Sequence, residues 1–222
     1  DDAAIQRHLL ALRERSVQAH AITAAQIALD AGRPHDALAV LDATDVQPLP
    51  PRGLALRAEA LASTARAGEA YGLLGALKQQ QALAPAAFDA LEVRLATQSL
   101  HEASDPNVLA ERWEALTKPL RLQPLVVAAY AERAAALRWE DAATRSIEQA
   151  LEARWDEDLV ALYGRLPVGK LDSRRASAQH WLHAHPASPA LLVTLGRLAR
   201  QQGQWTAAQE FLHRAVAQGA GA

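Results

Sequence analysis

Three histidines gather around one tryptophan late in the sequence: His180, His183 and His185 lie beside Trp181. On a helix, residues three apart share one face, so His180 and His183 could reach the same ligand. Imidazole nitrogens bind transition metals and heme iron. Histidines near the end of a helix can also simply interact with its dipole in solvent. Because no nearby carboxylate in the sequence would orient the imidazoles, we expect the structural role and no metal or cofactor.

Two pairs of adjacent carboxylates, Glu140–Asp141 and Glu157–Asp158, could in principle serve as general acids and bases. Both pairs stand where a helix is predicted to begin. Acidic residues are favoured there because the positive end of the helix dipole lies at the N-terminus. We therefore interpret both pairs as helix-starting residues.

Motifs of common enzyme classes are absent from the sequence. The nearest glycine pair, Gly72 and Gly75, fits neither the dinucleotide-binding nor the phosphate-loop spacing. Its helical context predicts close helix packing instead. No G-x-S-x-G elbow occurs, and the absence of Cys excludes a cysteine nucleophile, disulfides and thiolate ligands. The chain is therefore predicted not to be an enzyme.

Tryptophans recur at Trp139, Trp155, Trp181 and Trp205, where they could stack on nucleic-acid bases. They are not interleaved with Lys or Arg, the formal net charge is −2, and no basic block occurs. They recur instead at predicted boundaries between helix pairs. We predict that they pack within and between these pairs, and that the chain does not bind nucleic acid.

The composition predicts an all-α protein. Half of the 222 residues are hydrophobic, Ala and Leu dominate them, and aromatic residues make up only 5%. Ala and Leu are strong helix formers, whereas the scarcer β-branched and aromatic residues favour strands.

Residues 192–216 show a repeating pattern of helix, glycine-containing turn and helix that is similar to the tetratricopeptide repeat, or TPR. Small residues stand where the two helices would cross, and large residues surround them. The small residues are Gly196, Ala208 and Ala215, and the large ones are Leu192, Leu195, Trp205 and Leu212.

The same pattern predicts about six helix pairs after a leading helix at residues 2–15. Residues 86–117 and 156–185 fit it less well. Prolines fall between the helical segments, and Asp105–Pro106 and Ser188–Pro189 read as helix starts. Because stacked pairs bury a continuous core, we expect one TPR-like superhelical solenoid over residues 1–222.

The chain begins with Asp1 and contains no Met, so we expect it to be a fragment of a longer protein. No apolar run approaches the roughly 18 residues of a membrane span, and there is no signal peptide. This piece is therefore expected to be soluble.

Residues 153–166, ARWDEDLVALYGRL, are more specific than a generic repeat. They resemble the proteobacterial HemY family of TPR-containing inner-membrane proteins associated with heme biosynthesis. Other segments match the family in order, most strongly over residues 105–217. These are residues 105–119, 126–130, 178–186 and 191–197, with looser matches at 32–41 and 70–78.

The resemblance implies a membrane-anchored parent protein whose soluble TPR part lies in the cytoplasm. It also implies a scaffold or regulator in a late step of heme or porphyrin metabolism, with heme-pathway enzymes among its partners. The residues themselves also allow a structural reading of residues 153–166. Asp156 would cap a short helix, Trp155 and Leu162 would pack, and Gly164 would permit close approach.

In a TPR stack the first helix of each pair lines the concave face, where partner proteins bind. The repeat template places polar side chains there that could orient a partner by charge-assisted hydrogen bonds, with apolar side chains as anchors. Ordinary solvated lining of a groove is the alternative. The predicted binding residues are Ile22, Gln26, Glu59, Leu125, Glu132, Arg197 and Arg200.

Three functional hypotheses follow. The first is a membrane-tethered scaffold for heme-pathway proteins, which would raise their effective concentration. The second is a heme or porphyrin carrier that uses His180 and His183. The third is a generic TPR adaptor for other membrane-associated factors.

Overall fold

The computed structural model describes residues 5–6 and 16–219. Every regular element in these residues is an α-helix or a short 3-10 helix, which confirms the all-α prediction. The chain divides into two compact units, unit 1 (Asp1–Glu102) and unit 2 (Ala103–Ala222), and each is described by itself. Apart from residues 5 and 6, the predicted leading helix at 2–15 lies outside the described residues.

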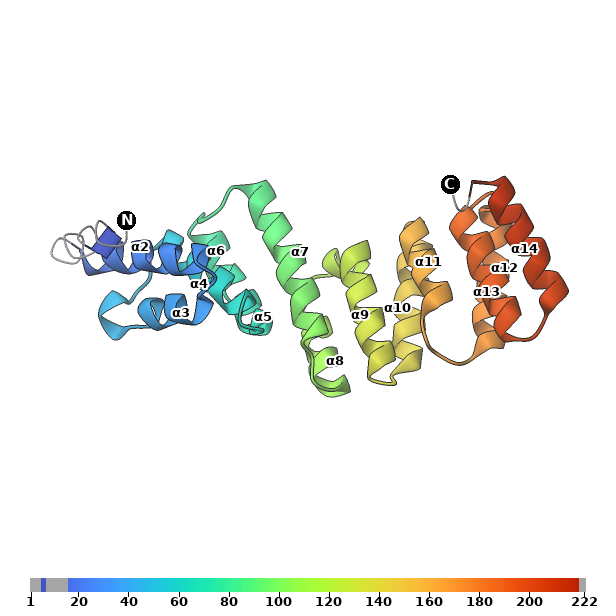
Figure 1. Ribbon diagram of the computed structural model, residues 1–222, viewed down its shortest axis with the longest axis horizontal. Helices are drawn as coiled ribbons and strands as arrows, with labels where there is room; N and C mark the ends of the chain where they lie inside the picture. The colour runs from blue at the N-terminus through green and yellow to red at the C-terminus, as the bar shows by residue number, and fades with distance from the viewer. Residues whose placement is uncertain (1–4, 7–15, 220–222) are drawn as a thin grey trace. The chain divides into compact units, whose positions relative to one another are not determined.

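Unit 1 is a series of helices in which neighbours along the chain pack on each other (Figure 1). Helix α2 contacts α3, α3 contacts α4, α4 contacts α5, and α5 contacts α7. The elements are α2 (Val17–Asp30), α3 (Pro34–Leu41), the 3-10 helix η1 (Thr44–Val46), α4 (Pro51–Ala62), α5 (Ala67–Gly72), α6 (Leu74–Gln79) and α7 (Pro85–His101).

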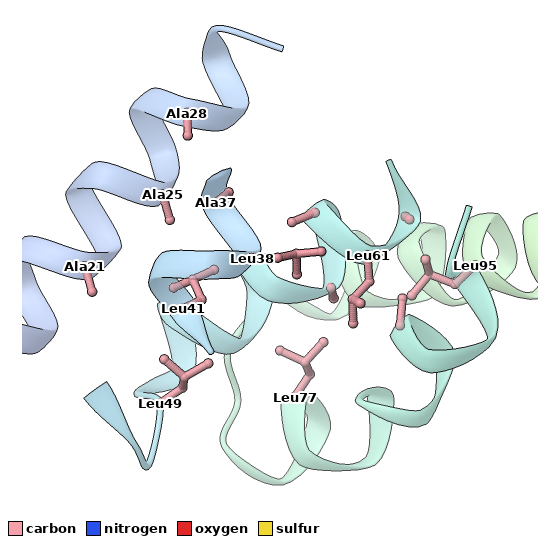
Figure 2. Packing of buried hydrophobic residues seen from close by; sticks show 14 of the residues in the cluster. Ala21, Ala25, Ala28, Ala37, Leu38, Leu41, Leu49, Leu61, Leu77 and Leu95 are labelled. Atoms are coloured by element: carbon pink, nitrogen blue, oxygen red, sulfur yellow. The ribbon is translucent and has the colours of Figure 1, made fainter. Parts of the chain in front are cut away.

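The core of unit 1 is built from alanine and leucine. Ala21, Ala25 and Ala28 recur every three or four residues and are buried along one side of α2. Figure 2 shows them near Leu38 and Leu41 of α3, which are also buried. The small alanine side chains allow the helices to approach closely, while the leucines fill the remaining space. This packing supports the predicted pairing of α2 with α3.

The predicted second helix of the next pair is interrupted in the structure. Helix α5 ends at Gly72, and α6 begins at Leu74. Gly72 and Gly75 are both exposed, and a Cβ atom added to either would meet no neighbouring atom within 4 Å. The prediction that these glycines permit close helix packing is therefore wrong. Glycine disfavours a helix by about 1 kcal/mol relative to alanine, which is consistent with an interruption at this point.

Unit 2 contains the remaining helices (Figure 1). Helix α9 packs on α10, α11 packs on α13, and α13 packs on α14. Helix α12 packs mainly on α13 rather than on α11, its predicted partner in a hairpin. The elements are α8 (Pro106–Glu114), the 3-10 helix η2 (Leu120–Leu122), α9 (Pro124–Ala136), α10 (Glu140–Ala153), α11 (Glu157–Arg165), α12 (Leu171–Ala184), α13 (Pro189–Gln201) and α14 (Trp205–Ala217).

The order of helices along the chain fits six predicted pairs, although α11 and α12 do not pack mainly on each other. These are α2 with α3, α4 with α5 and α6, α7 with α8, α9 with α10, α11 with α12, and α13 with α14. The boundary between the two units falls within the third pair, between α7 and α8. A continuous superhelical stack over the whole chain stays a prediction.

The predicted helix starts of unit 2 are confirmed by their hydrogen bonds. Asp105 accepts hydrogen bonds from the backbone N–H groups of Asn107 and Val108, at 2.9 and 3.0 Å. Asp156 accepts from the N–H of Leu159 at 3.0 Å, and Ser188 Oγ accepts from the N–H of Leu191 at 3.1 Å. These side chains satisfy backbone donors that the first turn of a helix leaves unpaired.

Two glycines mark the close helix crossings of unit 2. A Cβ atom on Gly164 of α11 would stand 2.5 Å from Thr194 Oγ1 and 3.0 Å from Thr194 Cα, both in α13. A Cβ on Gly196 would stand 2.9 Å from Leu212 in α14. Ala208 and Ala215 are buried on the facing side of α14. The predicted close approach at Gly164 and the small residues predicted at the last crossing are thus confirmed.

Candidate functional site

The first helices of the three consecutive pairs in unit 2 lie in a row, since α11 contacts both α9 and α13. Each is buried over most of its circumference and leaves a narrow line of accessible side chains. We call these lines together the unit 2 strip. It consists of Leu125 and Glu132 on α9, Asp158, Ala161 and Arg165 on α11, and Val193, Arg197 and Arg200 on α13.

The four predicted binding residues of unit 2 lie on this strip. Leu125 is 67% exposed, an unusual degree for a leucine beside the buried Val126 and Val127. Glu132 and Arg200 are exposed, and Arg197 is half-buried. Their predicted position on the concave face of a TPR stack, and binding itself, stay predictions.

Sequence reasoning missed the part of the strip that α11 contributes. Asp158 and Arg165 are exposed and Ala161 is half-buried, whereas Leu159, Val160 and Leu162 between them are buried. Residues 156–185 fit the repeat template poorly, so no inward positions were predicted there. Asp158, Ala161 and Arg165 are spaced by three and four residues, which places them on one face of a helix, and this spacing is the signal that could have found them.

The charged side chains of the strip are free to meet a partner. None of its five charged side chains forms a hydrogen bond or ion pair with another described residue. These side chains are Glu132, Asp158, Arg165, Arg197 and Arg200. Three of the five carry positive charge. The strip therefore offers guanidinium groups, two carboxylates and one large apolar side chain to whatever approaches it.

The predicted binding residues of unit 1 are differently placed. Ile22, Gln26 and Glu59 are all half-buried. Gln26 Nε2 donates a hydrogen bond to Asp30 Oδ1 at 2.9 Å. Glu59 Oε2 accepts one from Arg94 at 2.6 Å, in an ion pair. The polar groups predicted to receive a partner in unit 1 are thus already bonded within the protein.

The segment at residues 153–166 forms an aromatic junction. The Trp155 ring stacks on His185 at 3.6 Å between centroids and 13° between planes, and it meets the edge of Trp181 at 6.1 Å. Trp155 Nε1 donates to Glu157 Oε1 at 2.7 Å, and Glu157 Oε2 accepts from Ser188 Oγ at 2.7 Å. These contacts tie α11 to the ends of α12 and α13, so the structural interpretation of this segment is confirmed.

The other tryptophans divide between packing and exposure. Trp113, which sequence reasoning did not single out, stacks on Tyr130 at 4.0 Å, and Trp139 meets the edge of the same ring at 6.3 Å. Trp205 is 69% exposed, so its predicted role as a filler between helices is wrong. It stands at the first position of α14, where the buried Ala208 rather than the indole faces α13.

The two candidate ligand histidines lie in solvent. His180 and His183 are exposed on α12, with 6.5 Å between ring centroids and 69° between ring planes. Residues 5–6 and 16–219 hold no group of three or more His, Asp or Glu arranged to bind a metal ion. The two imidazoles are close enough to share a ligand, but nothing around them encloses one.

A buried polar cluster behind α11 was not predicted. Tyr163 Oη donates to Glu148 Oε1 at 2.6 Å, and Ser177 Oγ donates to the same oxygen at 3.1 Å. Arg174 is 1% exposed, lies over the Tyr163 ring at 5.3 Å, and donates to the carbonyl oxygens of Val168, at 2.8 Å, and Tyr163. Burial raises the pKa of Tyr163, and the hydrogen bond to Glu148 raises it further. A lone arginine inside a helix gives no signal in the sequence that it will be buried.

The paired carboxylates open α10 and α11, as predicted. Glu140 Oε2 accepts from the N–H of Gly169 at 2.8 Å, and Asp141 pairs with Lys170 at 2.5 Å. Hydrogen bonding to Lys170 lowers the pKa of Asp141. Both residues of the first pair therefore hold neighbouring segments together, as does Glu157 of the second pair, whereas Asp158 is unpaired among the described residues.

No helix among the described residues has both the length and the apolar character needed to cross a bilayer. Comparisons with protein-family models, with curated proteins and with solved structures found no match to this chain.

Proposed function

We propose that this protein is an interaction scaffold of TPR-like helix pairs and that partner proteins bind to the unit 2 strip. The observation that carries the proposal is the row of unpaired charged side chains on α9, α11 and α13. Each side chain stands beside fully buried residues of the same helix, so its backbone is held rigidly. A rigid backbone loses little conformational entropy when a partner binds, and the remaining cost is about 0.5–1.5 kcal/mol for each charged side chain that becomes ordered.

The chemistry of the strip favours a partner segment that carries carboxylates and one apolar side chain. Arg165, Arg197 and Arg200 outnumber Glu132 and Asp158. Guanidinium groups bind carboxylates through paired hydrogen bonds, which orient the partner as well as attract it. Leu125 would receive the apolar side chain, in the manner of an amphipathic helix that docks in a groove.

The resemblance of residues 153–166 to the HemY family adds a cellular location and a class of partners to the proposal. The scaffold would belong to a membrane-anchored protein of the bacterial inner membrane, with these helices in the cytoplasm. Its partners would be enzymes of late heme or porphyrin biosynthesis. If that resemblance is accidental, the same strip would serve a generic TPR adaptor for other membrane-associated factors.

Surface plasmon resonance can measure the binding of purified late heme-pathway enzymes to the 222-residue chain. This measurement tests both the binding surface and the identity of the partners. We expect the Arg197→Glu, Arg200→Glu double variant to weaken binding at least about tenfold, because reversed charge repels the carboxylates of the partner. Arg154→Glu is the matched control, since Arg154 is an exposed arginine outside the strip. Equal affinity of both variants would contradict the strip as the binding surface. Failure of every heme-pathway enzyme to bind would contradict the proposed setting.

A heme or porphyrin carrier acting through His180 and His183 has less support, because both side chains are exposed. Titration with heme and protoporphyrin, followed by absorbance and tryptophan quenching, separates the two functions. We expect no stoichiometric binding. Saturation at one equivalent that is lost in the His180→Ala, His183→Ala double variant would favour the carrier.

A further inference from the structure

A polar pocket of about 290 Å³ lies between α10 and the start of α12, apart from the unit 2 strip. Helices α10 and α12 are the second helices of their pairs, whereas the strip lies on first helices. All of the lining residues are of polar or charged type: Asp141, Thr144, Arg145 and Glu148 come from α10, and Lys170, Ser173 and Arg174 come from the beginning of α12.

Both carboxylates of this pocket are bonded within the protein. Asp141 is paired with Lys170 at 2.5 Å. Glu148 Oε1 accepts hydrogen bonds from the hydroxyls of Tyr163 and Ser177. Asp141 is therefore neutralised by an ion pair, whereas Glu148 is stabilised by hydrogen bonds alone.

The positive charges are not satisfied in the same way. Arg174 is 1% exposed, yet its guanidinium bonds only backbone carbonyl oxygens, and its Nε atom is buried without a hydrogen-bond partner. Arg145 donates from Nε to the carbonyl oxygen of Asp141, and no described residue accepts from the rest of its guanidinium. Neither arginine forms an ion pair with a carboxylate in the part of the chain that the structure describes. Glu140 and Glu148 act on Arg174 electrostatically without bonding it. Both arginines therefore keep charged N–H donors, from which an oxyanion in the pocket could accept hydrogen bonds.

The backbone adds to this preference. Helix α12 begins at Leu171 after Lys170, and no side chain caps its first turn. The N–H groups of such a turn are unpaired donors that favour negative charge. Ser173, in that same turn, lines the pocket and places a hydroxyl there as a further donor.

From the buried Arg174, the remaining free N–H donors of Arg145 and the uncapped start of α12, we propose that this pocket binds a small oxyanion, a carboxylate or a phosphate group. The inference does not depend on the proposed scaffold function. Arg174 also has a structural role, because its hydrogen bonds to the carbonyls of Tyr163 and Val168 join the end of α11 to α12. A test must therefore separate binding from folding.

The test is a titration of the isotopically labelled 222-residue chain with inorganic phosphate and, separately, with succinate at constant ionic strength. Backbone amide shifts are followed by NMR. We expect saturable shifts at residues 171–174. A response to phosphate alone or to succinate alone identifies the source of the oxyanion, and a response to both identifies the shared group. A response to neither, or an equal response to chloride, would overturn the proposal.

Arg145→Gln is the informative variant, because Arg145 is exposed and its replacement should leave the fold intact. We expect it to weaken binding at least about tenfold, since it removes a charged donor from the anion. Ser173→Ala should weaken binding by a smaller factor. Arg154→Gln is the matched control, an exposed arginine outside both the pocket and the unit 2 strip, and should bind as the natural chain does. Unchanged binding in Arg145→Gln, or equal weakening in Arg154→Gln, would overturn the site, and neither outcome requires Arg174 to be altered.

Discussion

Unit 1 and unit 2 are built from the same kind of helix pair, but they differ in the composition of their cores and in the pairing of their candidate binding residues. All five tryptophans belong to unit 2, whereas the core of unit 1 is alanine and leucine with Phe88. The candidate binding residue Glu59 of unit 1 is already paired with Arg94, while Glu132, Arg197 and Arg200 of unit 2 are unpaired. A repeat pattern thus predicts where the groove-facing positions are, but only the structure shows which of them are available to a partner.

The largest expected effect comes from the core of unit 1. Leu61 is 0% exposed, so Leu61→Ala removes packed methyl groups and leaves a cavity. We expect a loss of about 2–5 kcal/mol in the free energy of unfolding, measured by urea denaturation. The same substitution at Leu125 of unit 2, which is 67% exposed, should change stability by less than about 0.5 kcal/mol. Similar losses at both positions would contradict the difference in burial.

The next largest effect is expected from glycines, which are tightly packed at a helix crossing in unit 2 and open to solvent in unit 1. Gly164→Ala should destabilise the protein by about 1–3 kcal/mol, because the added Cβ would overlap Thr194 at the crossing of α11 and α13. Gly75→Ala in unit 1 should instead stabilise it by about 0.5–1 kcal/mol, since the site is open and alanine favours the helix. Thermal unfolding of the two variants measures both effects. Stabilisation by Gly164→Ala would contradict the close crossing.

A pH-dependent contribution is expected at Asp105, which caps α8 in unit 2. Hydrogen bonds from the N–H of Val108 and from Ser104 lower its pKa below the ordinary value for aspartate of about 3.9. The carboxylate therefore stabilises the fold at neutral pH, and this contribution is lost as the pH falls through the lowered pKa. Asp105→Asn keeps an acceptor but cannot titrate, so it should lose less stability than the natural chain on acidification from about pH 5 to pH 2. Equal acid sensitivity of the two proteins would contradict the role of this cap.

The smallest effects concern the candidate binding residues themselves. Glu59→Gln breaks the exposed pair with Arg94 and should cost about 0.2–1 kcal/mol in urea denaturation. Arg197→Gln should change stability by less than about 0.5 kcal/mol, because Arg197 has no ionic partner among the described residues. If Arg197→Gln proved the more destabilising of the two, the strip would have a structural rather than a binding role.

The sequence predicted the helical class, the order of the pairs and several local details. Asp105, Asp156 and Ser188 were recognisable because a cap depends only on residue type and the helix that follows. Gly164 and Gly196 were recognisable because small residues recur where helices cross. These features are local, and local rules suffice for them.

Features that depend on distant partners were not predictable in this way. The burial of Arg174 requires the carbonyls of Tyr163 and Val168 and the position of α10, which no sequence pattern specifies. Trp205 is predicted to pack because tryptophan usually does, yet Ala208 of α14 is buried against α13 instead. Whether Glu59 or Arg197 is available to a partner protein depends on whether a neighbouring helix carries a side chain of opposite charge within reach.

The central claim, that partners bind to the unit 2 strip, is tested most directly by site-specific photocrosslinking. A photoreactive amino acid would replace Ala161, which lies at the centre of the strip, or Gln149, which is exposed on α10 as the matched control. Each variant would be irradiated with purified late heme-pathway enzymes. We predict a covalent adduct from position 161 and none from position 149. Adducts of equal yield from both positions, or an adduct from position 149 alone, would contradict the claim.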